Sequence, residues 1–249
     1  RDDYTINVHG QLMALTKPQV MGILNVTPDS FFEGSRMQND QSIAERANQI
    51  VAEGATMIDI GGCSTRPGSE PVSQTEEMQR LRMALAVVRR ERPHSVISVD
   101  TFRPDVARMA VEEFGADIFN DVSEGSLEMY RMIARLRVPY ILMSVQPTLR
   151  DMLMAFSREV QQLRDFGVKD IILDPGFGFG KTVTQNYQVM NNLERLLVME
   201  LPILVGVSRK SMIFKLLGLT PDGALNGTSV LNTIALMKGA SILRVHDVK

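Results

Sequence analysis

The sequence predicts an α/β fold in which eight parallel strands, separated by helices, close into a (β/α)8 or TIM barrel. Three observations support this prediction. Short apolar runs alternate with segments of helical spacing along the chain. Eight such runs occur, and a doubly wound open sheet, the alternative, rarely needs so many regular repeats. No Gly-x-Gly-x-x-Gly motif follows the first run, as a dinucleotide-binding open sheet would require.

The predicted elements begin with residues 5–16, which alternate around His9-Gly10 and indicate a β-hairpin on the barrel floor. The eight strands follow at 20–25, 56–62, 96–100, 117–121, 139–143, 170–174, 202–208 and 241–246. The eighth helix is not present in this sequence, because the chain stops three residues after the last of these runs. No linker-like stretch interrupts the series, so we expect a single domain over residues 1–249.

Apolar residues recur on one helical face between several of these strands, and we expect those faces to pack on the barrel. The three clearest faces are Ile43, Ala47, Ile50 and Val51, then Met78, Leu81, Leu85 and Val88, and finally Val189, Leu193 and Leu196.

The composition favours a small-molecule partner. The chain is 44% hydrophobic, and its 27 basic and 29 acidic side chains give a net charge of −2, so no basic field exists to hold a nucleic acid or an anionic membrane. No apolar run approaches about 18 residues, so we expect no membrane span. Cys63 is the only cysteine and cannot form an internal disulfide; with no signal-like N-terminus, this favours the cytoplasm.

Polar residues cluster at the carboxyl ends of the predicted strands, which meet at one mouth of a parallel barrel. They are Asn25, Asp100, Asn120, Asp121, Asp174, Ser208, Arg209, Lys210, Arg244 and His246. Each alone is also typical of a turn or a helix cap, but together they indicate a site. Carboxylates and amides accept hydrogen bonds from a heterocycle rich in N–H donors, whereas Asn25, Arg244 and His246 suit a pyrophosphate.

Three loops at this mouth have unusual sequences. Residues 25–36 and 61–69 are long and mix aromatic, basic and acidic side chains, which predicts a closing lid. Residues 174–182 are rich in glycine and end in Gly-Lys-Thr, yet Pro175 stands where a phosphate-binding P-loop needs its leading glycine. We therefore reject the P-loop and predict that the phenylalanines of this run form flat walls around a ring.

Seven segments occur in an order that resembles the dihydropteroate synthase family of folate biosynthesis, from about residue 20 to the end of the chain. They are NVTPDSF, GGCSTRPG, SVDT, FND, LDPGFGFGK, GVSRKS and RVHD. The resemblance implies a transferase that joins 6-hydroxymethyl-7,8-dihydropterin pyrophosphate to p-aminobenzoate, releasing pyrophosphate and 7,8-dihydropteroate. It also implies Mg²⁺ as cofactor and sulfonamides as competitors of p-aminobenzoate, and we expect a homodimer.

The resemblance further implies roles for individual residues. The pterin-binding set is Asp100, Asn120, Met143, Asp174, Phe179, Gly206 and Lys210. The pyrophosphate-binding set is Asn25, Arg244 and His246, with Asn25 also meeting the metal, and the p-aminobenzoate set is Phe31, Thr65, Arg66, Pro67 and Ser211. Asp29, Glu33 and Lys210 are the expected catalytic residues. Pyrophosphate leaves first, loop carboxylates stabilise the cation that remains on the dihydropterin, and the aniline nitrogen then attacks without a strong base.

The chain departs from the family pattern at three places. Phe32 replaces a small residue and Glu33 an aspartate, Cys63 stands where glutamate is usual, and the loop after the fifth strand reads Met143-Ser-Val-Gln-Pro147. Three other functions remain as alternatives: a pterin-dependent methyltransferase, a Schiff-base aldolase using Lys210, and a pterin-binding paralogue without turnover. Release of pyrophosphate from both substrates separates the synthase from the paralogue.

Overall fold

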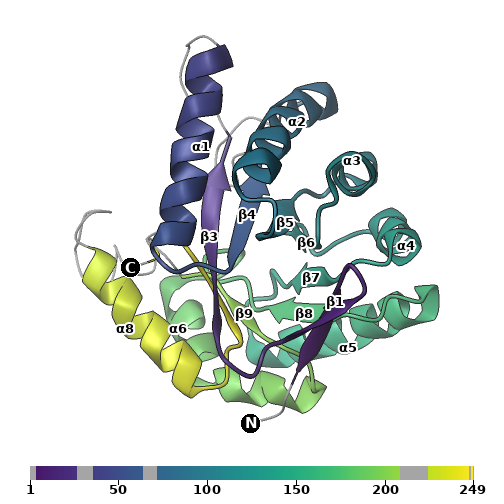
Figure 1. The fold of residues 1–249 in the computed structure, drawn as a ribbon. Helices are drawn as coiled ribbons and strands as arrows, with labels where there is room; N and C mark the ends of the chain where they lie inside the picture. The colour runs from purple at the N-terminus through teal and green to yellow at the C-terminus, as the bar shows by residue number, and fades with distance from the viewer. Residues whose placement is uncertain (1–3, 27–35, 64–71, 208–223, 247, 249) are drawn as a thin grey trace.

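The computed structural model describes residues 4–26, 36–63, 72–207, 224–246 and 248, and shows a ring of parallel strands surrounded by helices (Figure 1). The strands are β3 (Gln19–Asn25), β4 (Met57–Gly61), β5 (Val96–Asp100), β6 (Ile118–Asp121), β7 (Tyr140–Met143), β8 (Ile171–Asp174), β9 (Leu204–Val205) and β10 (Ile242–Val245). Their order in the sheet is β8-β7-β6-β5-β4-β3-β10-β9. The Leu173 N–H donates to the Pro202 carbonyl at 2.9 Å and brings β8 beside β9. The predicted barrel is therefore confirmed.

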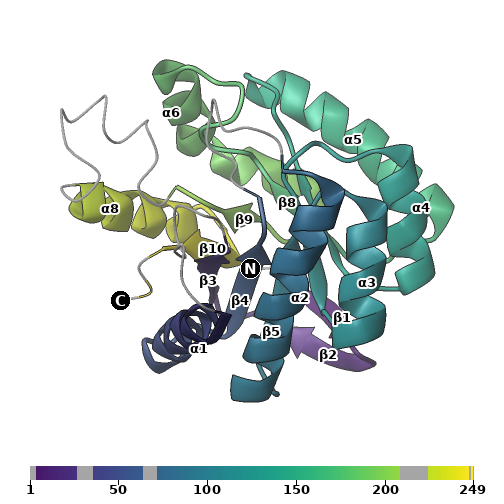
Figure 2. The same ribbon diagram turned by 90° about the horizontal axis from the view of Figure 1, so that it is seen from above.

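The helices form the outer layer when the barrel is viewed from above (Figure 2). They are α1 (Arg36–Ala52), α2 (Gln74–Glu91), α3 (Pro104–Phe114), α4 (Leu127–Leu136), α5 (Leu149–Phe166), α6 (Val183–Asn191), the 3-10 helix η1 (Leu193–Met199) and α8 (Ala224–Met237). None of these described helices is long and apolar enough to cross a membrane. After β10, the described part of the chain contains only residues 246 and 248 and no helix.

The predicted helical faces pack against the strands, with one correction. Ile43, Ala47 and Ile50 of α1 are fully buried, as are Leu81 and Leu85 of α2. The third face is not one helix as predicted. The chain leaves α6 at Asn192, where φ is −118° and ψ is 20°, and continues as η1. Leu193 and Leu196 are nevertheless fully buried, because a 3-10 helix also returns residues three apart to one face.

Alternate residues of the strands face two different cores, as the period of two requires. Outward residues such as Ile58, Val99 and Leu142 join the large core between strands and helices. Inward residues form a small apolar floor made of Met21, Met57, Ile118, Ile141, Ile172, Leu204 and Ile242. Two residues further along the same strands, the inward positions are Ile23, Asp59, Asn120, Met143, Asp174, Gly206 and Arg244. The barrel interior therefore changes from apolar to largely polar toward the carboxyl ends of the strands.

An N-terminal hairpin closes the floor, as predicted. Strands β1 (Thr5–Val8) and β2 (Gln11–Ala14) are joined by a two-residue turn at His9 and Gly10, whose φ angles of 50° and 80° suit a primed turn. Ile6 and Leu15 of this segment are buried against the floor residues.

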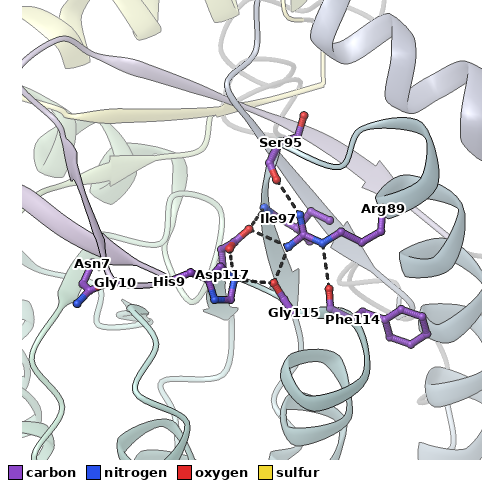
Figure 3. A network of polar contacts seen from close by, with 9 residues as sticks. All are labelled: Asn7, His9, Gly10, Arg89, Ser95, Ile97, Phe114, Gly115 and Asp117. Atoms are coloured by element: carbon purple, nitrogen blue, oxygen red, sulfur yellow. Dashed lines mark hydrogen bonds and ion pairs between the residues drawn. The ribbon is translucent and has the colours of Figure 1, made fainter.

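His9 docks the hairpin onto the barrel, as Figure 3 shows. Its Nε2 lies 2.8 Å from the Gly115 carbonyl and 2.5 Å from Asp117 Oδ1. Arg89 approaches from the other side and donates to Asp117 Oδ2 at 3.1 Å and to the carbonyls of Phe114 and Ser95 at 2.9 and 3.0 Å. The buried Asp117 carboxylate thus joins the hairpin, α2 and β6.

Replacing His9 with Ala removes one polar anchor of the hairpin; the other, from the Asn7 N–H to Asp170 Oδ2 at 2.8 Å, remains. We expect the free energy of unfolding to fall by about 1 kcal/mol, because one hydrogen-bonding side chain is lost at a half-exposed position. Urea unfolding measures this change. Leu12→Ser on the same hairpin is the control, since Leu12 is 75% exposed and should leave the midpoint unchanged. Equal midpoints for His9→Ala and the parent would contradict the docking role.

Candidate active site at the barrel mouth

A network of charged and polar side chains occupies the interior above the apolar floor. Arg244 Nε donates to Asp59 Oδ2 at 2.7 Å, and its Nη2 lies 3.6 Å from Asp100 Oδ2. Ser98 Oγ donates to Asp59 Oδ1 at 2.8 Å, and Asn120 Nδ2 donates to Asp59 Oδ2 at 3.1 Å. Strands β4, β5, β6 and β10 each contribute to this network, so closing the barrel assembles it.

Burial and like charge act together on Asp100. Burial, followed by the nearby Asp59 carboxylate, raises the pKa of Asp100 well above its ordinary value, and the Arg244 guanidinium opposes this shift. Burial opposes the charge of Arg244, but the carboxylates of Asp59 and Asp100 together raise its pKa. The guanidinium therefore stays charged, whereas Asp100 accepts a proton more readily than an exposed aspartate does.

Asn120 offers an unused hydrogen-bond acceptor inside the barrel. The residue is fully buried and its Nδ2 is taken by Asp59, yet its Oδ1 has no hydrogen-bond partner in the described part of the chain. A buried acceptor without a partner costs about 1–3 kcal/mol, which a ligand N–H at this position would recover. The geometry therefore favours a ligand with ring or amino N–H groups.

Asp174 and Phe179 lie on a glycine-rich loop that rests against the end of β7. The Gly176 N–H donates to Asp174 Oδ1 at 2.9 Å, and Gly176 has a φ of 68°. A Cβ at Gly176 would lie 2.1 Å from the Ser144 carbonyl oxygen and 3.1 Å from Met143 Cγ. Only glycine permits this approach, which brings the loop containing Asp174 and Phe179 against Met143.

Asn25 and His246 lie at the rim, at the ends of the paired strands β3 and β10. A Cβ at Gly61 would be 3.6 Å from both Asn25 Oδ1 and Asp100 Oδ2, so Asn25 lies beside the buried network. The His246 carbonyl accepts a hydrogen bond from Arg46 Nη2 at 2.7 Å, which fixes the end of β10. The structure thus brings the expected pterin and pyrophosphate residues that it describes to one mouth.

The remaining predicted site residues lie outside the described part of the chain. They are Asp29, Phe31, Glu33, Thr65, Arg66, Pro67, Lys210 and Ser211, together with the departure at Phe32. Their roles stay predictions.

Asp59 was not among the predicted site residues, although it lies at the centre of the network. The sequence could have indicated it. Asp59 interrupts the apolar run Met57–Gly61, and the period of two places it on the inward face with Met57. Asp121, in contrast, ends its strand facing the helices. It accepts hydrogen bonds from the Tyr140 hydroxyl at 2.6 Å and the Ser123 N–H at 3.0 Å, and so stabilises the turn after β6.

Cys63 stays a thiol at the start of the second loop. Burial, with a smaller effect of Glu77, raises the pKa of Cys63 to about 12. Because the thiolate is the reactive form, this raised pKa disfavours a nucleophilic role near neutral pH.

Comparisons with known proteins identify relatives of this chain. Residues 21–246 match the family described as pterin binding enzyme. The chain is 39% identical to the dihydropteroate synthase of Escherichia coli strain K12 over 259 positions, covering 96% of this chain and 90% of that protein. Among solved structures, it is similar to Xanthomonas albilineans dihydropteroate synthase with 4-aminobenzoic acid, with a TM-score of 0.93, 34% identity, and coverage of 99% and 94% of the two chains. It is also similar to a Yersinia pestis dihydropteroate synthase with a sulfonamide drug, with a TM-score of 0.90, 37% identity, and coverage of 99% and 94%.

Proposed function

Since the chain belongs to the pterin-binding enzyme family, we propose that its barrel mouth carries out the dihydropteroate synthase reaction. The substrates are 6-hydroxymethyl-7,8-dihydropterin pyrophosphate and p-aminobenzoate, and the products are 7,8-dihydropteroate and pyrophosphate. The observation that carries this conclusion is the buried polar layer above the apolar floor, in which Asn120 keeps an acceptor that no described residue satisfies.

The described residues supply side chains of the right chemistry for a pterin ring. Asp174 and Asn120 present buried oxygens to ring and amino N–H groups, and Asp100 binds either as acceptor or, when protonated, as donor. Met143 and the half-buried Phe179 provide apolar faces against which a flat ring packs. Lys210 is expected to complete this frame.

The pyrophosphate of the substrate is assigned to the rim formed by Asn25, Arg244 and His246. Nε and Nη2 of Arg244 are engaged by carboxylates, so an anion would approach Nη1. Among the described residues no hydrogen bond reaches the Asn25 side chain, and no group of three His, Cys, Asp or Glu residues forms a metal cage. This fits Mg²⁺, which binds through few protein oxygens plus substrate phosphates and, when bound, neutralises the leaving pyrophosphate. Asn25 would hold it.

The chemical step follows from the substrates. When pyrophosphate leaves, the electron-rich dihydropterin delocalises the positive charge on its exocyclic carbon, and the carboxylates of Asp29 and Glu33 are proposed to stabilise it. The aniline nitrogen of p-aminobenzoate then attacks this carbon and loses a proton. Phe31, Thr65, Arg66, Pro67 and Ser211 are the residues proposed to hold p-aminobenzoate.

The decisive experiment measures pyrophosphate release with both substrates, with each alone, and after removal of Mg²⁺ by a chelator. We expect release that requires both substrates and Mg²⁺ and that a sulfonamide inhibits. If the protein binds a pterin but releases no pyrophosphate under these conditions, it is a binding paralogue and the proposed reaction is wrong.

Gly206 provides a test of where the ring lies. Among the described residues, a Cβ at this position would meet only Arg244 Cβ at 3.7 Å and the Arg244 carbonyl oxygen at 3.9 Å, which are ordinary contacts. Gly206→Ala should therefore leave the urea midpoint unchanged. If the ring packs on β9, the added methyl group should weaken binding about tenfold, as overpacking costs about 1–3 kcal/mol. Calorimetry with pteroic acid, the oxidised form of the product, measures this, and unchanged affinity would place the ring elsewhere.

A further inference from the structure

Lys181 is a partly buried cation that the proposed reaction leaves unused. It belongs to the Gly-Lys-Thr run that is not a P-loop. Its Nζ donates to three backbone carbonyls, those of Gly176 and Phe179 at 3.0 Å each and that of Ser144 at 3.3 Å. All three donor positions of the ammonium group are therefore used. Two of the acceptors lie in its own loop and the third follows β7.

The loop that Lys181 closes fits tightly against the chain after β7. A Cβ at Gly180 would lie 2.5 Å from the Val145 carbonyl oxygen, as one at Gly176 would clash with Ser144. Both glycines have positive φ angles, 65° and 68°. Such close backbone contact leaves few alternatives for the loop path, and the ammonium of Lys181 connects its two turns to the neighbouring segment.

Two carboxylates face the ammonium group from different elements. Asp174 lies at the end of β8, and Glu124 lies in the turn between β6 and α4. Glu124 also accepts hydrogen bonds from the Val145 N–H at 3.0 Å and from Gln146 Nε2 at 3.4 Å. The segment after β7 is thus held by Glu124 on one side and Lys181 on the other.

The charge of Lys181 is kept at a cost. Burial lowers its pKa from 10.5 to about 8, although Asp174 and Glu124 oppose this shift. Between pH 8 and 10.5 Lys181 binds fewer protons in the folded protein than in the unfolded chain. The contribution of Lys181 to the free energy of unfolding therefore rises with pH across this range and is least favourable below pH 8, where the buried amine is charged. A cation retained against this cost suggests a role in the site.

We propose that Lys181 is a positioning residue for the pterin, because its ammonium group fixes the Phe179 backbone against the segment after β7. Phe179, Met143 and Asp174 are then held beside one another before the ligand arrives. This inference rests on the proposed function, because it takes the pterin as the ligand of these residues.

The test is calorimetry with pteroic acid at pH 7 and pH 9 on the parent, Lys181→Met, Lys181→Gln and the control Lys169→Met, whose lysine is exposed. At pH 7 we expect Lys181→Met to bind about tenfold more weakly or worse, since three carbonyls lose their donor. Lys181→Gln keeps an N–H donor, so its affinity should lie between those of Lys181→Met and the parent. Lys169→Met should match the parent.

The pH series separates positioning from a general structural role. About a tenth of Lys181 remains protonated at pH 9. If the uncharged form binds about tenfold more weakly, as expected for Lys181→Met, the parent should bind about fivefold more weakly at pH 9 than at pH 7. Titration of the ligand changes the affinity of all variants by the same factor. Lys181→Met and Lys181→Gln should therefore lack only the part of the pH dependence of affinity that comes from Lys181. The proposal is overturned if Lys181→Gln and the parent have the same affinity at pH 7, or the same pH dependence. Turnover of both substrates by the parent is measured separately. A wrong positioning role for Lys181 can therefore be distinguished from a wrong proposed reaction.

Discussion

Replacing Arg244 with Met should lower the free energy of unfolding by about 3–5 kcal/mol and abolish turnover. The guanidinium is the cation within 4 Å of both Asp59 and Asp100 in the described part of the chain. Both carboxylates are buried, so its removal leaves them near each other with no cation among the described residues to compensate their charge. Urea unfolding followed by circular dichroism measures the loss of stability, and pyrophosphate release measures activity.

The pH dependence of this loss has a defined sign. Burial already raises the pKa of Asp100, and removing Arg244 raises it further, because the guanidinium lowers it in the parent. A carboxyl group whose pKa is higher in the folded than in the unfolded state favours folding at low pH, and this advantage is lost as the pH rises through the folded pKa. The deficit of Arg244→Met relative to the parent should therefore be larger at pH 8 than at pH 5.

A double variant tests whether uncompensated charge causes the loss. Asp59→Asn combined with Arg244→Met removes one carboxylate together with the guanidinium, and it should recover part of the stability that Arg244→Met loses. Asp59→Asn alone is measured for comparison. If the losses of free energy of unfolding in Asp59→Asn and Arg244→Met simply add in the double variant, the ion pair does not explain the stability of the barrel interior. The same conclusion follows if the loss in Arg244→Met is equal at pH 5 and pH 8.

The strands and most described site residues followed from the sequence because both depend on local pattern. A period of two places Asn120 and Asp174 on the inward face directly from their distance to Ile118 and Ile172. Pairings between distant strands do not follow in this way. Arg244 and Asp59 are 185 positions apart, so the sequence suggested an anion contact for Arg244 but not the two carboxylates beside it.

Backbone geometry explains two other differences. Helical spacing could not show that the chain changes to a 3-10 helix after Asn192, because buried leucines three residues apart fit both forms. The sequence also argued against a P-loop at Lys181 but did not show what the lysine binds. Its acceptor at Ser144 lies 37 residues earlier and reaches Lys181 only because β7 and β8 are neighbours.

Asp174→Ala should weaken pteroic acid binding about 10- to 100-fold at pH 7, because ring N–H groups would lose a buried charged acceptor worth about 1–3 kcal/mol. The same carboxylate also accepts the Gly176 N–H at 2.9 Å, so alanine additionally releases the loop. Asp174→Asn separates the two effects, since its amide oxygen still accepts from Gly176 while the second position becomes a donor that opposes the ring N–H groups. We therefore expect Asp174→Asn to keep the stability of the parent and lose most of the affinity. Calorimetry that finds parental affinity in Asp174→Asn would show that Asp174 holds the loop and not the pterin.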